Sequence, residues 1–71
     1  MNLYFYEGPV KEFDRIVDKK WSGKTMAVSE RQARNNLAYQ FKVAYGRIPR
    51  TKISLPGEII KIEMEDYGYD D

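Results

Sequence analysis

The stretch Ser29–Gly46, with the sequence SERQARNNLAYQFKVAYG, has the features of a complete amphipathic helix. Ser29 suits the N-cap position, and Gln32 three residues later completes the capping-box pattern S-x-x-Q. Apolar residues follow at spacings of four, four and three, along one helical stripe: Ala33, Leu37, Phe41 and Ala44. Gly46 suits the C′ position that ends a helix. The sequence therefore predicts one helix at about 30–45, with its apolar stripe in the core.

Strands are predicted before this helix. Leu3–Glu7 is rich in aromatic residues, which favour strands, and Gly8-Pro9 is expected to end the run. Alternation divides its side chains between two faces, with Leu3 and Phe5 on one and Tyr4 and Tyr6 on the other. Thr25–Val28 is a second strand candidate, directly before the helix.

The segment Val10–Trp21 fits two interpretations. Four of its residues have the spacing of a short helix: Phe13, Ile16, Val17 and Trp21. The same segment fits a strand that continues through Lys20 to Thr25, with a bulge or turn at Ser22-Gly23. We favour the strand, because it gives Leu3–Glu7 a hairpin partner.

Two alternating segments follow the helix, Thr51–Leu55 and Glu58–Met64. Between them, Pro56-Gly57 suits the centre of a type II turn, because Pro fixes the first φ and Gly permits a positive second φ. The pattern leaves open whether this turn makes a hairpin or bends one long strand.

The predicted fold class is therefore α+β. We expect two layers, a three- to four-stranded antiparallel sheet in the order β-β-α-β with one helix covering one face. The opposite face is then open to solvent or to a partner. Residues 1–64 are predicted to form a single domain, and the acidic residues 65–71 a frayed tail.

The composition excludes several kinds of chemistry. The chain has 71 residues, of which none is Cys or His. There is consequently no thiolate nucleophile, Ser-His-Asp triad or HExxH metal site. We expect no enzymatic activity, cofactor or metal. No run approaches the roughly 20 apolar residues of a membrane span, so we expect a cytoplasmic protein.

The formal net charge of +1 conceals a strong asymmetry. From Lys19 to Lys52 the chain has nine basic residues and one acidic residue, a net charge of +8. From Glu63 to Asp71 it has five acidic residues and no basic one. Segregation of this kind indicates an anionic partner.

Five motifs extend over most of the chain, Tyr4–Ile60: YFYEGPV from Tyr4, WSGKT from Trp21, A-x-S from Ala27, AR-x-NL-x-YQFK from Ala33 and KI-x-LPG from Lys52. In these motifs the chain resembles a group of small proteins encoded by phages and mobile elements of Gram-positive bacteria. The resemblance implies a bacterial host cell and carries no established activity. The layout is also similar in topology to the archaeal ribosomal protein LX.

Nucleic-acid binding through a basic helix and loop is the leading hypothesis, because Lys and Arg neutralise phosphates. The candidate residues are Lys24, Arg31, Arg34, Lys42, Arg47, Arg50 and Lys52. The competing interpretation is a solvated face balanced by the acidic tail. Tyr4, Tyr6 and Tyr39 are candidates for partner contact, the first two only if their strand face is the uncovered one. Alternative partners are a host protein that the module modulates, or a second copy of the chain.

Overall fold

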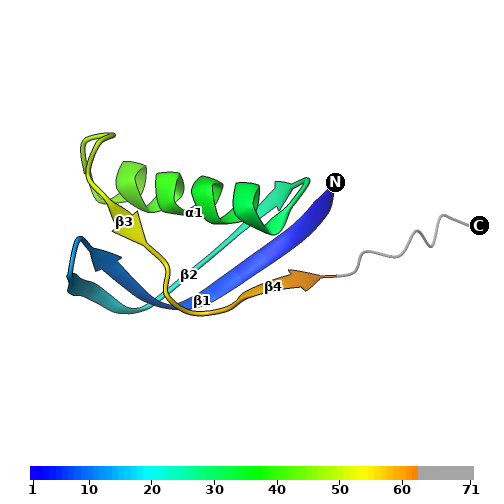
Figure 1. The fold of residues 1–71 in the computed structure, drawn as a ribbon, viewed down its shortest axis with the longest axis horizontal. Coiled ribbons are helices and arrows are strands. Elements are labelled where there is room, and N and C mark those ends of the chain that lie inside the picture. Colours follow the sequence, from blue (N-terminus) through cyan, green and yellow to red (C-terminus); the bar gives the residue numbers. More distant parts are fainter. Residues whose placement is uncertain (63–71) are drawn as a thin grey trace, which may run out of the picture.

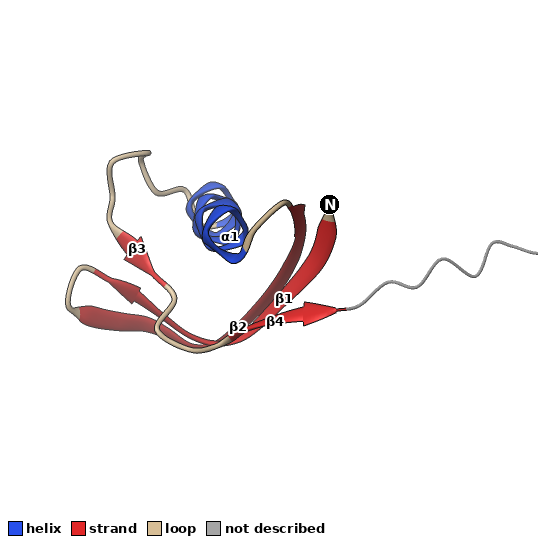
Figure 2. Ribbon diagram, turned by 45° about the vertical axis from the view of Figure 1, so that its right-hand side comes forward, coloured by secondary structure: helices blue, strands red, loops and turns tan. Residues whose placement is uncertain are grey.

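Four antiparallel strands and one helix form residues 1–62, the part of the chain that this computed structural model describes. The elements are β1 (Asn2–Glu12), β2 (Arg15–Ala27), α1 (Glu30–Ala44), β3 (Ile53–Ser54) and β4 (Ile59–Ile62). Figure 1 shows α1 lying across the sheet, and Figure 2 shows the sheet curving beneath it. The predicted α+β class and β-β-α-β order are confirmed. The predicted tail, 65–71, lies outside the described residues.

The N-terminus of α1 forms as the sequence predicts. The backbone N–H of Gln32 donates to Ser29 Oγ at 3.2 Å, which is the N-cap hydrogen bond. In return, Gln32 Oε1 accepts from the backbone N–H of Val28 at 2.9 Å. The reciprocal bond therefore reaches one residue further back than in the standard capping box.

The C-terminus of α1 is closed by a Schellman motif. Arg47 N–H donates to the Lys42 carbonyl at 2.7 Å, and Gly46 N–H donates to the Val43 carbonyl at 3.4 Å. Gly46 has a φ of +69°, which a residue with a Cβ adopts only at a cost. The motif turns the chain back toward the sheet immediately after the helix.

β1 and β2 form one long hairpin joined by the two residues Phe13 and Asp14. The preference for a strand over a helix in Val10–Trp21 is thereby confirmed. The prediction that Gly8-Pro9 ends the first strand is wrong, because β1 continues to Glu12. The predicted bulge at Ser22-Gly23 is also wrong, since these residues pair regularly with β1.

The irregularity in the hairpin lies nearer its tip. The register shifts once between Gly8 and Val10 and again between Val10 and Lys11, so β2 has two extra residues there. Bulges increase the local twist of a ribbon. The shifts therefore fall where the sheet needs to curve around the helix.

β3 and β4 are two parts of one interrupted strand rather than a hairpin. Both pair with β1 on the edge away from β2, both are antiparallel to it, and both keep the same register. The Pro56-Gly57 segment thus bends a single strand without adding or removing a residue from the pairing. This settles the alternative that the sequence leaves open.

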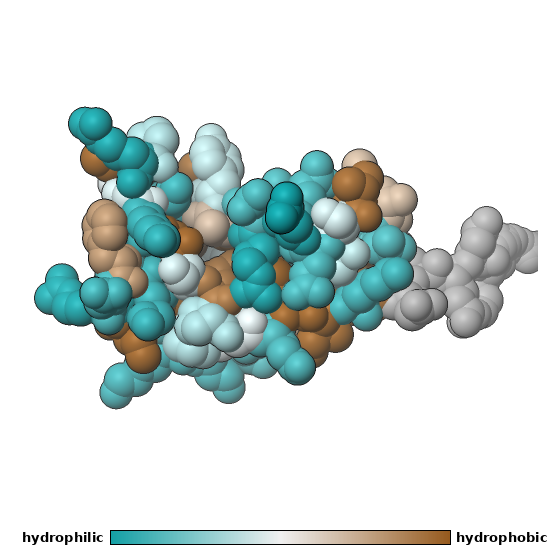
Figure 3. Space-filling model, viewed as in Figure 1, coloured by the Kyte–Doolittle hydropathy of each residue, from teal (hydrophilic) through white to brown (hydrophobic). Residues whose placement is uncertain are grey.

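α1 covers one face of the sheet and closes a small core. The central cluster contains Tyr6, Val10, Leu37, Phe41 and Leu55, all at most 2% exposed. Trp21 packs against it, with its ring edge-on to Phe41 at a centroid distance of 5.6 Å. The helical stripe is as predicted except for Ala44, which is exposed because it lies in the last turn. Other hydrophobic side chains form separate patches among hydrophilic residues on the surface (Figure 3).

The Tyr6 hydroxyl accommodates two prolines in the sheet. Continuing the register from either side places Pro9 of β1 opposite Pro56, where neither residue has an N–H to donate. The hydroxyl donates to the Pro9 carbonyl at 2.6 Å and accepts from Gly57 N–H at 3.0 Å. The hydroxyl lies so close that a Cβ on Gly57 would be 3.0 Å from its oxygen. The Tyr6 hydroxyl thereby provides hydrogen bonds at the point where the two prolines interrupt the backbone pairing.

Replacing Tyr6 with Phe tests this arrangement, because it removes one atom and leaves two backbone groups without their partner. We expect the free energy of unfolding to fall by about 1–3 kcal/mol in urea denaturation. Tyr4→Phe is the matched control: its hydroxyl makes no hydrogen bond to the described residues, so a change within about 0.5 kcal/mol is expected. Equal losses in both variants would contradict the proposed role.

Candidate nucleic-acid interface

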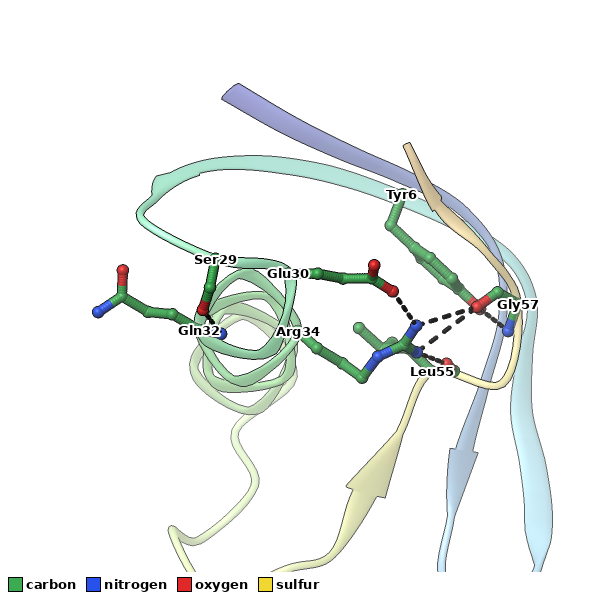
Figure 4. Close-up of polar contacts among 7 residues, drawn as sticks. All are labelled: Tyr6, Ser29, Glu30, Gln32, Arg34, Leu55 and Gly57. Atoms are coloured by element: carbon green, nitrogen blue, oxygen red, sulfur yellow. Dashed lines mark hydrogen bonds and ion pairs between the residues drawn. The ribbon is translucent and has the colours of Figure 1, made fainter. Parts of the chain in front are cut away.

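The seven basic residues predicted to bind a polyanion fall into two groups: some have partners within the chain, and the others are exposed. Arg34 has an internal role in the fold (Figure 4). Its guanidinium donates to the carbonyls of Leu55 and Gly57, the latter at 3.5 Å, and lies 3.4 Å from the Glu30 carboxylate. Arg34 therefore ties the helix to the interrupted strand, next to the Tyr6 hydroxyl.

Lys42 and Arg47 also have partners within the chain. Lys42 Nζ donates to the Pro49 carbonyl at 2.7 Å. Arg47 Nε forms an ion pair with Glu12 Oε1 at 3.1 Å, and Arg47 Nη1 donates to the Tyr45 carbonyl at 3.2 Å. Both side chains hold the loop after α1 in place. They therefore contribute to the fold and are less available to bind a polyanion.

Lys24 and Arg31 are exposed, and they lie on different elements from the loop residues Arg47, Arg50 and Lys52. Lys24 pairs with Phe5 across the hairpin, on the sheet face that α1 does not cover. Arg31 lies in the first turn of α1, whereas Arg50 lies beyond its last turn. α1 has 15 residues and is about 22 Å long, so Arg31 and Arg50 lie near opposite ends of the helix. The seven residues therefore do not form one continuous patch.

Arg50 and Lys52 are exposed in the loop between α1 and β3, and the end of this loop reaches the tip of the hairpin. Phe13 N–H donates to the Lys52 carbonyl at 2.9 Å, and Tyr45 Oη donates to Asp18 Oδ2 at 3.3 Å. We call this part of the molecule the hairpin end. It comprises residues 11–19 and 45–52.

The hairpin end combines positive charge with exposed apolar side chains. It contains six basic and three acidic residues, a net charge of +3. One acidic residue, Glu12, is neutralised by Arg47. The exposed apolar or aromatic residues here are Phe13, Ile16, Tyr45 and Ile48. Basic residues interspersed with an exposed ring are typical of surfaces that bind single-stranded nucleic acid.

The predicted partner contacts at Tyr4 and Tyr6 are wrong for this fold. Both residues lie on the sheet face that α1 covers, with exposures of 6% and 0%. The condition for base stacking, an uncovered face, is therefore not met. Tyr39 lies on the outer side of α1 and is 62% exposed, so it is accessible.

The uncovered face of the sheet has an apolar end. Leu3 pairs with Met26 on one side and Ile62 on the other, and Phe5 pairs with Ile60 in the next row. Leu3 and Phe5 are half-buried, whereas Met26, Ile60 and Ile62 are 38–54% exposed. The face thus presents neighbouring apolar side chains from three strands.

The exposed ring of the hairpin end and three of its six basic residues were missed as site candidates: Phe13, Lys11, Arg15 and Lys19. They were missed because the hairpin turn has no typical turn sequence. A two-residue hairpin with a positive φ at its first position usually has Gly there, but this chain has Phe13 with a φ of +58°. The loop pairing that brings Lys52 to the hairpin tip has no local sequence signal either.

No pocket is detected among residues 1–62, and no helix in that range is long and apolar enough to cross a membrane. Comparisons with known protein families, curated proteins and solved structures found no match to this chain.

Arg34→Met tests the internal role of Arg34, because Met keeps an apolar stem of similar length and removes every donor. We expect the free energy of unfolding to fall by about 1–2 kcal/mol, measured by urea denaturation. Arg31→Met, three residues away on the exposed side of the helix, should change it by less than about 0.5 kcal/mol. If the two variants unfold alike, Arg34 does not tie the helix to the strand.

Proposed function

We propose that this chain is a non-enzymatic binding module, encoded by a phage or mobile element, that binds nucleic acid through the hairpin end. The phage or mobile-element setting rests on the sequence resemblance described above. The binding proposal rests on one observation: the Phe13–Lys52 backbone hydrogen bond brings the basic loop beside the hairpin tip. Cations from two distant parts of the sequence thereby share one surface.

The hairpin end has free cations held on an ordered support. Arg50 and Lys52 are exposed and form no ion pair with the described residues. The loop that carries them is fixed by the Schellman motif, by Lys42 on the Pro49 carbonyl and by Arg47 on Glu12. A preorganised loop loses less conformational entropy when it binds. Its cations would contact phosphates and release counterions, which makes binding salt-dependent.

Two charge-matched double variants test the location of the site. Arg50→Gln with Lys52→Gln removes two cations from the hairpin end, and Lys24→Gln with Arg31→Gln removes two from elsewhere. In fluorescence-anisotropy titrations of labelled DNA and RNA, we expect the first pair to weaken binding across all sequences. The slope of log K against log salt should become shallower by about 1 per removed cation. The second pair should leave both quantities nearly unchanged.

Two results would overturn the proposal. One is the absence of any binding to DNA or RNA at low salt. The other is an equal loss in the two double variants, which would indicate a general effect of net charge rather than a site.

A protein partner is the second candidate, and the apolar end of the uncovered sheet face favours it. Ile60 and Ile62 stand side by side there with Leu3, Phe5 and Met26, and clusters of this kind are typical of interaction sites. The occupant would be a host protein or a second copy of the chain.

Ile60→Gln is the variant for this candidate, because the side chain is 54% exposed and its loss should not unfold the domain. If a protein partner uses this face, the variant should lose a stoichiometric partner that wild type retains from nuclease-treated host lysate. For a second copy, analytical ultracentrifugation should show a dimer in wild type and a monomer in the variant. A partner retained equally by both proteins would count against this face.

A further inference from the structure

Phe13 occupies the tip of the β1–β2 hairpin with a positive φ, a conformation that favours glycine or asparagine. It is the first residue of the two-residue turn, with a φ of +58°, which is uncommon for a bulky side chain. The side chain is 59% exposed, so core packing does not explain why a large ring stands there. Glycine or asparagine would make the same turn with less strain.

The backbone at Phe13 is held in place by contacts on both sides. Its N–H donates to the Lys52 carbonyl at 2.9 Å, and the flanking residues Glu12 and Arg15 form the last pair of the hairpin. Glu12 is further fixed by its ion pair with Arg47. The ring is therefore attached to a fixed stretch of backbone rather than to a flexible loop.

Basic residues lie near Phe13 in the hairpin and in the loop bonded to its backbone. Arg15 follows it in the hairpin, Lys52 is bonded to its backbone, and Arg50 lies two residues before Lys52 in the same loop. Two acidic residues flank it: Asp14 in the turn, and Glu12, which pairs with Arg47. An exposed ring on the same surface as several cations can stack on a base while the cations contact the adjacent phosphates.

We propose that Phe13 stacks on an unpaired base, so that the hairpin end prefers single-stranded nucleic acid to duplex. This inference rests on the nucleic-acid binding proposed above and names its substrate class. Inserting the ring into a duplex would require unstacking, which costs about as much as one aromatic stack supplies. An unpaired base offers its face without that cost.

The test uses the full chain and a labelled oligothymidylate of about 12 nucleotides, with a duplex of the same length as competitor. We expect wild type to prefer the single strand. Phe13→Ala and Phe13→Leu should each weaken binding to oligothymidylate by roughly 5- to 150-fold, the range that stacking on one base provides. Because the ring is uncharged, neither variant should change the salt dependence. Phe13→Trp should bind oligothymidylate as tightly as wild type. On binding, its fluorescence should be quenched more than that of wild type, in which Trp21 is the source.

Each outcome has a distinct meaning. If wild type binds no nucleic acid, the proposed function fails. If wild type binds and Phe13→Ala binds equally well, or the duplex is preferred, the proposed function stands and the stacking role of Phe13 is wrong. Full affinity in Phe13→Leu would also overturn stacking, because leucine is apolar but has no π face. Circular dichroism of each variant checks that the fold is intact, and no loss of structure is expected at an exposed turn residue.

Discussion

The hydroxyl of Tyr6 is the interaction on which the rest of this structure depends. It lies in the centre of the core, yet it bonds the Pro9 carbonyl of its own strand and Gly57 N–H of the neighbouring one. Without it, the sheet would have two facing prolines and two partly buried backbone groups lacking partners, which is costly. Arg34 supports the same point from the helix through the carbonyls of Leu55 and Gly57.

These contacts of Tyr6 and Arg34 in the middle of the sheet also determine how the chain is arranged at the hairpin end. Because the strand continues through the interruption in unbroken register, β3 pairs with β1 beside the turn. The loop before β3 is then brought to the hairpin tip, where Lys52 meets Phe13 and Arg47 meets Glu12. Pro9 lies about three residues before the end of β1. The surface proposed to bind nucleic acid therefore depends on the contacts that allow Pro9 and Pro56 to lie opposite each other in the sheet.

The sequence predicts the local features of this fold well. Capping by Ser29, the Gly46 terminus and the buried stripe of α1 are all set by neighbouring residues, and they form as expected except for Ala44 and the Gln32 bond to Val28. Predictions failed where distant contacts decide. Gly8-Pro9 does not end β1, because Tyr6 and Gly57 satisfy the groups that Pro9 disturbs. Arg34 and Arg47 are indistinguishable from free surface cations in the sequence, since their partners lie 21 and 35 residues away.

Amide hydrogen exchange of wild-type protein tests the central claim most directly, because it reports individual backbone donors. The account predicts slow exchange for Gly57 N–H, held by the Tyr6 hydroxyl, and for Phe13 N–H, held by the Lys52 carbonyl. Protection at Gly57 should approach that of the central β1 amides. Exchange of both amides at the rate of an unstructured chain would contradict the account, because neither the interrupted strand nor the hairpin end would then be held together as described.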